Sequence, residues 1–156
     1  MKIRLMKIED SNLVYLLWKE AGLDVVDYKT EKEDMEQIIK LNPYTNFVIC
    51  EKEKIVGAVL GAFNGRRAWV YHLAIYPFFQ NKGLGALLLH KTEEALKKSG
   101  AKKVQLFVSK TNLKVIGFYK KQGYRQLDEV IPFGKSLPAA PIIKVEGTNE
   151  GERIYL

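Results

Sequence analysis

The sequence predicts a single α/β domain in which a mixed, mostly antiparallel sheet carries helices on both faces. Three observations support this fold class. The length of 156 residues fits one domain. Hydrophobic residues make up 47% and charged residues 28% of the chain, as in ordinary globular proteins. Short β-rich runs with turn signals dominate the first half, whereas the second half changes to an alternation of helical and β-rich stretches.

The first half begins with a strand and two helices. Charged and apolar residues alternate over 2–8, which predicts the strand. Asp10 or Ser11 can cap a first helix that ends at Gly22. Thr30-Glu31-Lys32-Glu33 has the spacing of a capping box and predicts that a second helix begins there.

Three further strands are predicted over 47–51, 55–63 and 68–76. Asn64-Gly65 is the strongest hairpin signal in the chain and lies between the last two of them. These strands are therefore expected to form an antiparallel meander.

The period of the apolar residues then changes to that of a helix over 84–96, which Ser99-Gly100 stops. A strand, a second helix and a final strand are predicted over 104–108, 113–121 and 124–130. The domain is expected to span 1–137, and 138–156 to form a C-terminal tail or an extra edge strand.

The net charge of +7 is concentrated in one third of the chain. Residues 80–125 carry 11 basic and 2 acidic residues, a balance of +9, whereas 1–79 balance at zero and 126–156 at −2. A phosphorylated cofactor, a nucleic acid or only solvent could face this segment. Because it lacks the signatures of nucleic-acid-binding folds, we expect no nucleic-acid partner.

Several other classes of protein are disfavoured. The single cysteine, Cys50, excludes an intramolecular disulfide framework. No stretch approaches the roughly 20 apolar residues of a membrane helix, and the N-terminal alternation is not that of a signal peptide. We therefore expect a cytoplasmic protein without a membrane partner. His72 and His90 lie 18 residues apart with no cysteine partner, so no metal site is expected.

A glycine-bearing turn, Gln80-Asn81-Lys82-Gly83-Leu84-Gly85, joins the strand before Pro77 to the following helix. The N-terminus of a helix presents unpaired N–H groups, and glycines let an anion approach them closely. The first turn of the helix, 84–87, has no acidic residue, and Lys82 adds a positive charge beside it. Taken alone, the two glycines fit an anion site and an ordinary turn equally well. The turn matches neither the P-loop nor the dinucleotide-binding fingerprint.

Two longer stretches resemble the GCN5-related N-acetyltransferases, the GNAT superfamily. His72-Leu73-Ala74-Ile75-Tyr76-Pro77 together with the turn through Gly85 resembles motif A of that family. Val108-Ser109-Lys110-Thr111-Asn112 followed by Gly117-Phe118-Tyr119 and Gly123-Tyr124 is similar to motif B. The resemblance covers roughly 1–137 and is greatest to the small bacterial and archaeal acetyltransferases of the YpeA type.

The resemblance implies an acetyl-CoA-dependent N-acetyltransferase in which an amine attacks the thioester directly within a ternary complex. It also implies that parallel strands four and five splay apart and that the pantetheine arm of the cosubstrate fills the gap. The residues implied in cofactor binding are Leu73, Ala74, Ile75, Gln80, Asn81, Lys82, Gly83, Leu84, Gly85, Ala86, Asn112 and Tyr119. Asn112 would bind the pantetheine amide, or else cap a helix.

The resemblance implies that Tyr119 protonates the leaving thiolate; the alternative is that its ring only packs on the core. The strand positions where many relatives carry a glutamate base hold Trp69 and Phe107. His72 and Tyr71 are the nearby candidates for the base, and histidine has a suitable ordinary pKa of about 6.5. Water, or no base at all, is the alternative. Alternation along a strand predicts that Tyr71 and His72 point to opposite faces.

The acceptor is expected to be a primary amine, carried by a small molecule or a protein. In the resembled family its pocket is formed by the first helix, the loop after it and the strand 6–7 region, here Trp18, Asp24, Asp27, Tyr28 and 129–133. Asp24 and Asp27 could attract a cationic amine or could only be solvated. A monomer or homodimer is expected. The missing base leaves a non-catalytic or weakly catalytic acyl-CoA-binding module as the alternative function.

Overall fold

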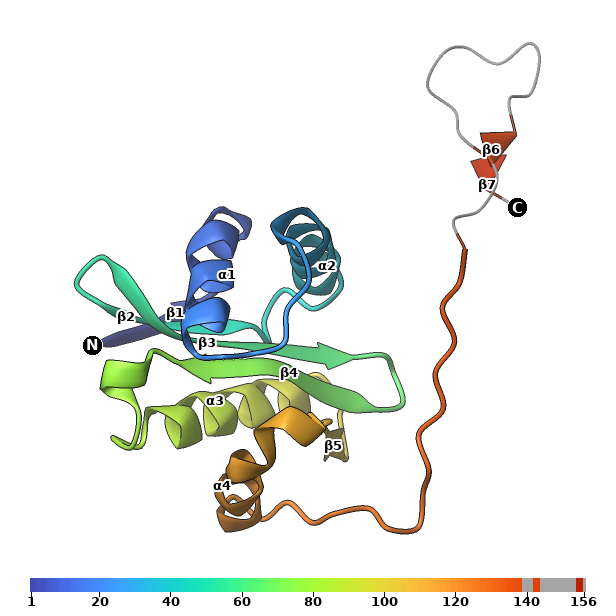
Figure 1. Cartoon of the computed structure of the whole chain (residues 1–156). Coiled ribbons are helices and arrows are strands. Elements are labelled where there is room, and N and C mark those ends of the chain that lie inside the picture. The colour runs from blue at the N-terminus through green and yellow to red at the C-terminus, as the bar shows by residue number, and fades with distance from the viewer. Residues whose placement is uncertain (139–141, 144–153, 156) are drawn as a thin grey trace. The chain divides into compact units, whose positions relative to one another are not determined.

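The structure is a computed structural model that describes residues 1–138, 142–143 and 154–155. The chain forms two compact units, Met1–Tyr124 and Arg125–Leu156. The first unit contains a five-stranded sheet, with helices on both of its faces (Figure 1). The fold class expected from the sequence is confirmed, and every residue expected in catalysis or cofactor binding belongs to this unit, whereas 129–133, expected at the acceptor pocket, belong to the second.

The sheet has the strand order β1-β2-β3-β4-β5, antiparallel except for its last pair. Its strands are β1 (Lys2–Leu5), β2 (Phe47–Glu51), β3 (Lys54–Phe63), β4 (Ala68–Ile75) and β5 (Val104–Gln105). The Asn64 side-chain oxygen accepts hydrogen bonds from the N–H groups of Arg66 and Arg67, which closes the β3–β4 turn. The predicted hairpin and meander are thus confirmed.

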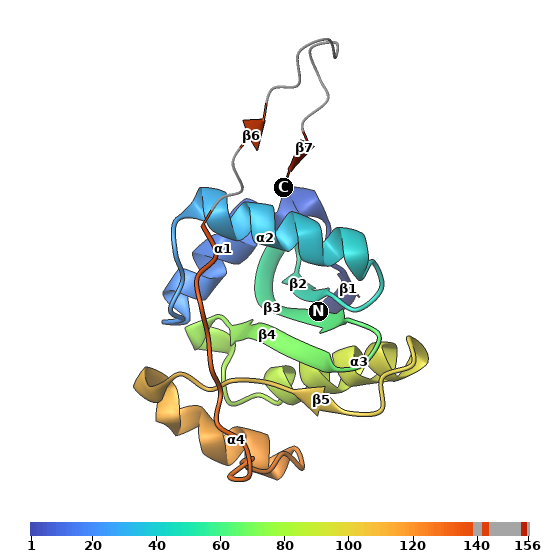
Figure 2. The ribbon, with the colours of Figure 1, turned by 90° about the vertical axis from the view of Figure 1, so that its right-hand side faces the viewer.

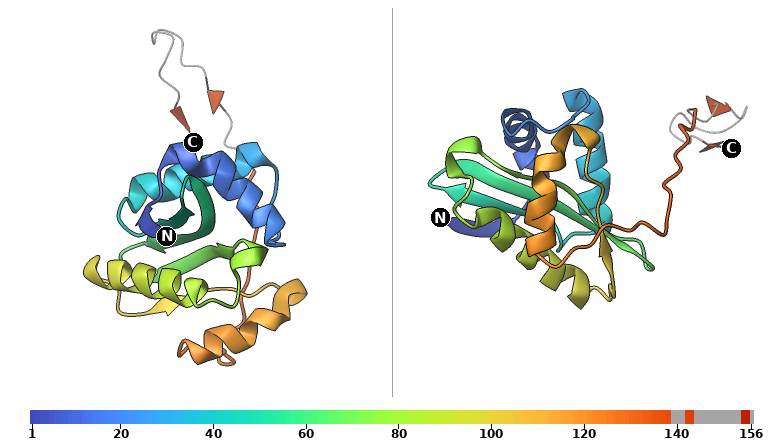
Figure 3. Two further views of the ribbon diagram at one scale, coloured as in Figure 1. Left: turned by 90° about the vertical axis from the view of Figure 1, so that its left-hand side faces the viewer. Right: turned by 60° about the horizontal axis from the view of Figure 1, so that its bottom comes forward.

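Two helices cover one face of the sheet, and the longest helix covers the other (Figures 2 and 3). The first two are α1 (Ser11–Glu20) and α2 (Tyr28–Leu41), and the opposite face carries α3 (Leu84–Lys98), with α4 (Ile116–Lys121) on the same side. Short 3₁₀ turns precede three of these helices: η1 (Ile8–Asp10), η2 (Pro77–Phe79) and η3 (Lys110–Val115).

Each face of the sheet has its own apolar core because side chains alternate along β3 and β4. Trp18 and Met35 pack with Leu60 on the α1–α2 face, and all three are almost fully buried. Val59 and Leu88 belong to the core on the α3 face. The edge of β4 therefore lies between two packed layers that hold it in place.

Several expected elements differ in the structure. Helix α2 begins at Tyr28 because the Asp27 side chain accepts hydrogen bonds from the Thr30 N–H and hydroxyl, so the cap lies three residues before the predicted capping box. The strands predicted over 2–8 and 104–108 are shorter and end at Leu5 and Gln105. The strand predicted over 124–130 is absent, because these residues pair with no strand among the described residues.

In the second unit, β6 (Ile142–Ile143) and β7 (Ile154–Tyr155) pair with each other as an antiparallel sheet. The remainder of the predicted tail, 139–141, 144–153 and 156, lies outside the described residues. The domain boundary after residue 137 stays a prediction.

Of the two glycines in β3, Gly61 has the less space around it for a side chain. An added Cβ would lie 2.6 Å from Thr92 Cγ2 and 2.7 Å from the Thr45 carbonyl oxygen. The Asn46 and Thr45 side chains also bind the N–H and C=O of Gly61, which keeps its backbone from shifting. We expect Gly61→Ala to lower the free energy of unfolding by about 2 kcal/mol in urea denaturation.

The matched control for this substitution is Gly117→Ala, where an added Cβ meets no atom within 4 Å. Gly117 lies in α4, so alanine there should leave stability unchanged or raise it by roughly 0.5 kcal/mol. Equal effects of the two substitutions would contradict the packing argument.

Candidate active site

β4 and β5 separate almost as soon as they meet. Only two residue pairs join them, Ala68 with Val104 and Trp69 with Gln105. β4 continues to Ile75, so within the described part of the chain its later residues have no strand beside them on this edge. The expected splay between the parallel strands is therefore present, and it leaves the backbone groups of one strand edge open.

The hydrogen bonds of β4 show which groups face the gap. The Tyr76 N–H donates to the Val56 carbonyl in β3, so alternation directs the N–H and C=O of Ile75 to the opposite edge. The Gln80 side-chain amide donates to the Ile75 carbonyl at 2.9 Å from that edge. Ala74, paired with Ala58, directs its backbone groups toward β3. Of the three residues expected to bind the arm, Ile75 is thus beside the open edge, and Leu73 lies in an irregular stretch of the β3–β4 pairing.

The turn after β4 ends at the N-terminus of α3. Gly83 is the N-cap of α3 and has φ +78°, a conformation that glycine adopts without strain. The Leu87 N–H donates to the Gly83 carbonyl, which is the first hydrogen bond of the helix. The N–H groups of 84–86 therefore have no acceptor within α3. The first turn of α3 has no acidic residue. Three N–H groups and an uncompensated helix dipole therefore point out of this end.

The side chains of the turn support it in different ways. The Lys82 ammonium lies 4.6 Å from the ring centroid of Phe78, a cation–π contact that keeps the charge beside the turn. An added Cβ at Gly85 would lie 3.5 Å from the Phe118 ring, an ordinary van der Waals distance, so α4 packs beside this glycine without requiring it. Gly83 is required for its backbone conformation, with φ +78°.

Tyr119 lies on the α3–α4 side of the open edge, where it and Leu73 pack against the same core. Burial raises the pKa of the Tyr119 hydroxyl above its ordinary value of 10.0, so it is protonated at neutral pH. The neighbouring Tyr124 donates its hydroxyl to Glu93 at 2.7 Å and is engaged there. Asn112 lies in η3, whose cap is Ser109, and its non-helical φ of −125° and ψ of 39° divide this segment into two helical pieces. Both expected roles of Asn112, in binding pantetheine and in capping, stay predictions.

His72 lies at a β-bulge. The register passes from Leu60–Tyr71 to Ala58–Ala74, which leaves His72 and the next residue opposite a single residue of β3. His72 has φ +48°. As a result Tyr71 and His72 line the same cavity, of about 270 Å³, on the α2 side. The prediction that they point to opposite faces is wrong, because strict alternation fails at a bulge.

The surroundings of His72 favour its neutral form. Its ring stacks on Trp18 with centroids 4.4 Å apart. Burial lowers the pKa of His72 below 6.5, against the opposing influence of the Glu31 and Asp34 carboxylates and a hydrogen bond with the Asp24 backbone. His72 can therefore accept a proton at neutral pH, from the face opposite Tyr119.

The lowered pKa of His72 predicts how stability depends on pH. Below pH 6.5 the unfolded chain binds more protons at this histidine than the folded protein does, so the free energy of unfolding should fall on acidification. We expect the melting temperature to decrease between about pH 6.5 and pH 5, and to decrease less in His72→Gln. Asp10, Asp24 and Asp27 have lowered pKa values as well. Their contribution to the free energy of unfolding is lost only as the pH falls below 3.8, outside this window. Parallel pH curves for the two proteins would contradict the prediction.

The two aspartates expected to attract a cationic acceptor are occupied. Asp24 accepts hydrogen bonds from the Ser109 and Thr111 hydroxyls, both at 2.9 Å, and these bonds lower the pKa of its carboxyl. Asp27 caps α2. The carboxylates that line the cavity are Glu31 and Asp34, which sequence reasoning missed. Glu31 lies four residues before Met35, on the apolar side of α2. A charged residue at such a position is unusual, and this could have indicated its role from the sequence.

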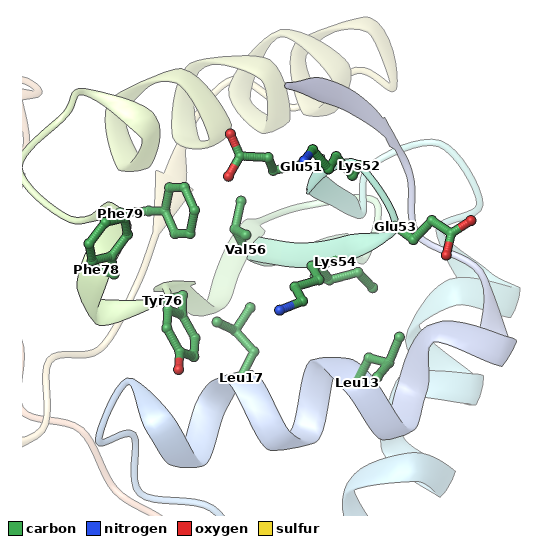
Figure 4. Close-up of a pocket in the computed structure, with 11 residues that line it drawn as sticks. Leu13, Leu17, Glu51, Lys52, Glu53, Lys54, Val56, Tyr76, Phe78 and Phe79 are labelled. Atoms are coloured by element: carbon green, nitrogen blue, oxygen red, sulfur yellow. The ribbon is translucent and has the colours of Figure 1, made fainter.

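A larger groove of about 1060 Å³ lies at the other end of β4 (Figure 4). Leu13 and Leu17 of α1 border it, and Tyr76, Phe78 and Phe79 line the end nearest to the turn. It contains neither His72 nor Tyr119. The smaller cavity is lined by His72, and Tyr119 lines neither of the two.

The chain belongs to the acetyltransferase (GNAT) family, whose model matches residues 12–124. An acetyltransferase of Pectobacterium atrosepticum is 31% identical over 137 residues, which are 88% of this chain and 96% of that protein. The resemblance of the two motifs to the GNAT superfamily is therefore confirmed. This protein is an acetyltransferase by family.

Solved structures agree on the fold. A predicted acetyltransferase of Clostridium acetobutylicum, solved with acetyl-CoA, matches with a TM-score of 0.72 and 19% identity over 85% of this chain and 95% of that one. The PaiA N-acetyltransferase of Thermoplasma acidophilum, solved with coenzyme A, matches with a TM-score of 0.70 and 22% identity over 81% of this chain and 91% of that one. None of the helices in the described residues has the length and apolar character of a membrane span, and no three metal-ligating side chains cluster there.

Proposed function

We propose that this protein transfers the acetyl group of acetyl-CoA to a primary amine by direct attack within a ternary complex. The observation that carries the proposal is the gap beside β4, which is open along Leu73–Ile75 and leads to the acid-free N-terminus of α3. An extended amide-bearing arm fits an unpaired strand edge, and a pyrophosphate fits a helix N-terminus.

The cosubstrate is held by residues at three places. The pantetheine arm binds along the edge of β4, and Asn112 approaches it from η3. The pyrophosphate binds at the turn that precedes α3, where N–H groups and the charge of Lys82 converge. The proposed binding residues of the turn are Gln80, Asn81, Lys82, Gly83, Leu84, Gly85 and Ala86.

The proposed chemistry uses groups on both faces of the sheet at β4, with His72 on the α1–α2 face and Tyr119 on the α3 face. The amine nitrogen forms a bond to the thioester carbonyl carbon, and the carbon–sulfur bond breaks. His72, or water beside it, takes the proton that the amine loses, and Tyr119 gives its proton to the leaving thiolate. An N–H of the open edge stabilises the carbonyl oxygen as it gains charge. The acceptor side and the thiol side thus lie on opposite faces of one strand.

A second function is favoured by one observation. Trp69 and Phe107 form an edge-to-face pair, with centroids 5.1 Å apart, at the positions where many members of the resembled family carry a glutamate base. A chain without a strong base could bind acyl-CoA and turn it over slowly or not at all. A non-catalytic or weakly catalytic acyl-CoA-binding module is therefore the alternative. For either function we propose a cytoplasmic monomer or homodimer.

Thermal-shift titration with acetyl-CoA, followed by measurement of thiol release over a panel of primary amines, separates these functions. We expect acetyl-CoA to raise the melting temperature and at least one amine to accelerate thiol release. Stabilisation without turnover on any amine would support the binding module. The absence of stabilisation by acetyl-CoA or coenzyme A would overturn both proposals.

A further inference from the structure

The cavity at the β4 bulge has a local charge opposite to that of the whole chain. The chain carries +7, yet the residues that line this cavity include two carboxylates, Glu31 and Asp34, and no lysine or arginine from the described part of the chain. Its volume of about 270 Å³ is close to the lower limit of pockets that enclose small molecules. Its electrostatics therefore favour a small cationic ligand.

Glu31 presents an oxygen to this cavity that no described protein group binds. The residue is only 6% exposed. One carboxylate oxygen, Oε1, accepts the Val26 N–H at 3.0 Å. The other, Oε2, receives no hydrogen bond from the described part of the chain and is not fully buried, and Glu31 lines the cavity. A buried carboxylate with one open oxygen is costly unless a donor occupies that position.

Aromatic rings extend the same preference beyond the carboxylates. Tyr71 lines the cavity, and its ring lies nearly parallel to that of Trp69, with an angle of 14° and centroids 6.4 Å apart. Trp69 in turn contacts Phe107, which is 73% exposed. The faces of aromatic rings attract cations. The carboxylates and the aromatic rings thus both favour a positively charged ligand.

We propose that this cavity is the acceptor subsite and that it selects amines carrying a second positive charge, which Glu31 and Asp34 bind beside the ring of Tyr71. This inference rests on the proposed acetyl transfer, because it assigns the substrate class of the same site. One ammonium group stays charged in the cavity. The other, after it loses a proton, lies at the open edge of β4 next to His72.

Comparison of two probes of equal chain length tests the inference, namely 1,4-diaminobutane and 1-aminobutane. We expect kcat/KM for the diamine to exceed that for the monoamine by about 10-fold, as for one charged hydrogen bond. Glu31→Gln, which keeps an acceptor for Val26, and Asp34→Asn should each remove most of this ratio. Tyr71→Leu should reduce it as well.

Glu33→Gln is the matched control, since Glu33 lies exposed on α2, does not line the cavity and carries the same charge. It should leave the ratio unchanged. Equal activity on the two probes, or an equal loss of the ratio in Glu33→Gln and Asp34→Asn, would overturn the inference while leaving acetyl transfer intact.

A binding measurement keeps this test independent of turnover. In a chemical-shift titration of the protein with coenzyme A bound, 1,4-diaminobutane should perturb the amides of Tyr71 and His72 more strongly than 1-aminobutane does. The effect should disappear in Glu31→Gln. Equal shifts for the two probes, or shifts only at residues elsewhere, would overturn the inference even if no amine is acetylated.

Discussion

Ala86→Asp is expected to weaken acetyl-CoA binding by about 100-fold without loss of folding stability. Ala86 is the third residue of α3, in the acid-free first turn. A carboxylate at this position interacts favourably with the helix dipole and should raise the free energy of unfolding by roughly 0.5 kcal/mol. The same charge would lie beside the proposed pyrophosphate and repel it. Stability and affinity should therefore change in opposite directions.

Isothermal titration with acetyl-CoA and urea denaturation measure the two effects. Ala86→Asn is the control, because asparagine has nearly the same shape as aspartate and no charge, and it should retain most of the affinity. Undiminished affinity in Ala86→Asp would show that the anion lies elsewhere. An equal loss in both variants would indicate a steric effect, and the N-terminus of α3 would lose its assignment as the phosphate site.

Tyr119→Phe is expected to lower kcat by about 100-fold while the affinity for acetyl-CoA stays within about 2-fold of wild type. Phenylalanine keeps the ring contacts with Phe118 and Tyr124, with centroids 5.1 and 5.7 Å away, so packing in α4 is retained. Only the hydroxyl that would protonate the thiolate is lost. Initial rates of thiol release with a saturating amine measure the effect.

Tyr124→Phe is the matched control for the hydroxyl of Tyr119. The Tyr124 hydroxyl donates to Glu93, and burial with this contact raises its pKa far above the ordinary range. Its removal should lower the free energy of unfolding by about 1 kcal/mol and leave kcat unchanged. If Tyr119→Phe retained full kcat, the thiolate would have to take its proton from another donor, and Tyr119 would be only a packing residue.

The parts of the site that depend on local sequence were predictable. The helix that begins after Gly83 could be predicted because the glycine, the missing acidic residue and the apolar period all lie within one short segment. The hairpin at Asn64 was predictable for the same reason. Errors occurred where two local signals competed. Asp27 and Thr30 can both cap a helix, and the chain uses Asp27.

The acceptor side was not predictable from the sequence, because it depends on contacts between distant segments. Strict alternation along β4 fails at His72, since a bulge is decided by the pairing with β3 and not by the residues of β4 alone. Asp24 had the charge expected for an acceptor site but is bound by Ser109 and Thr111, which are more than 80 residues further along the chain.

By itself, the sequence determined the order of elements from the first strand to α4, the helix N-terminus after Gly83 and the family. Capping, glycine conformation and apolar periodicity act over a few neighbouring residues and can therefore be recognised in the sequence alone. Only the tertiary structure decided that His72 faces α2 and that Glu31 and Asp34 line the same cavity as His72. Strand register and the packing of a helix on a sheet are collective, because each is set by the total burial of many side chains that are distant along the chain.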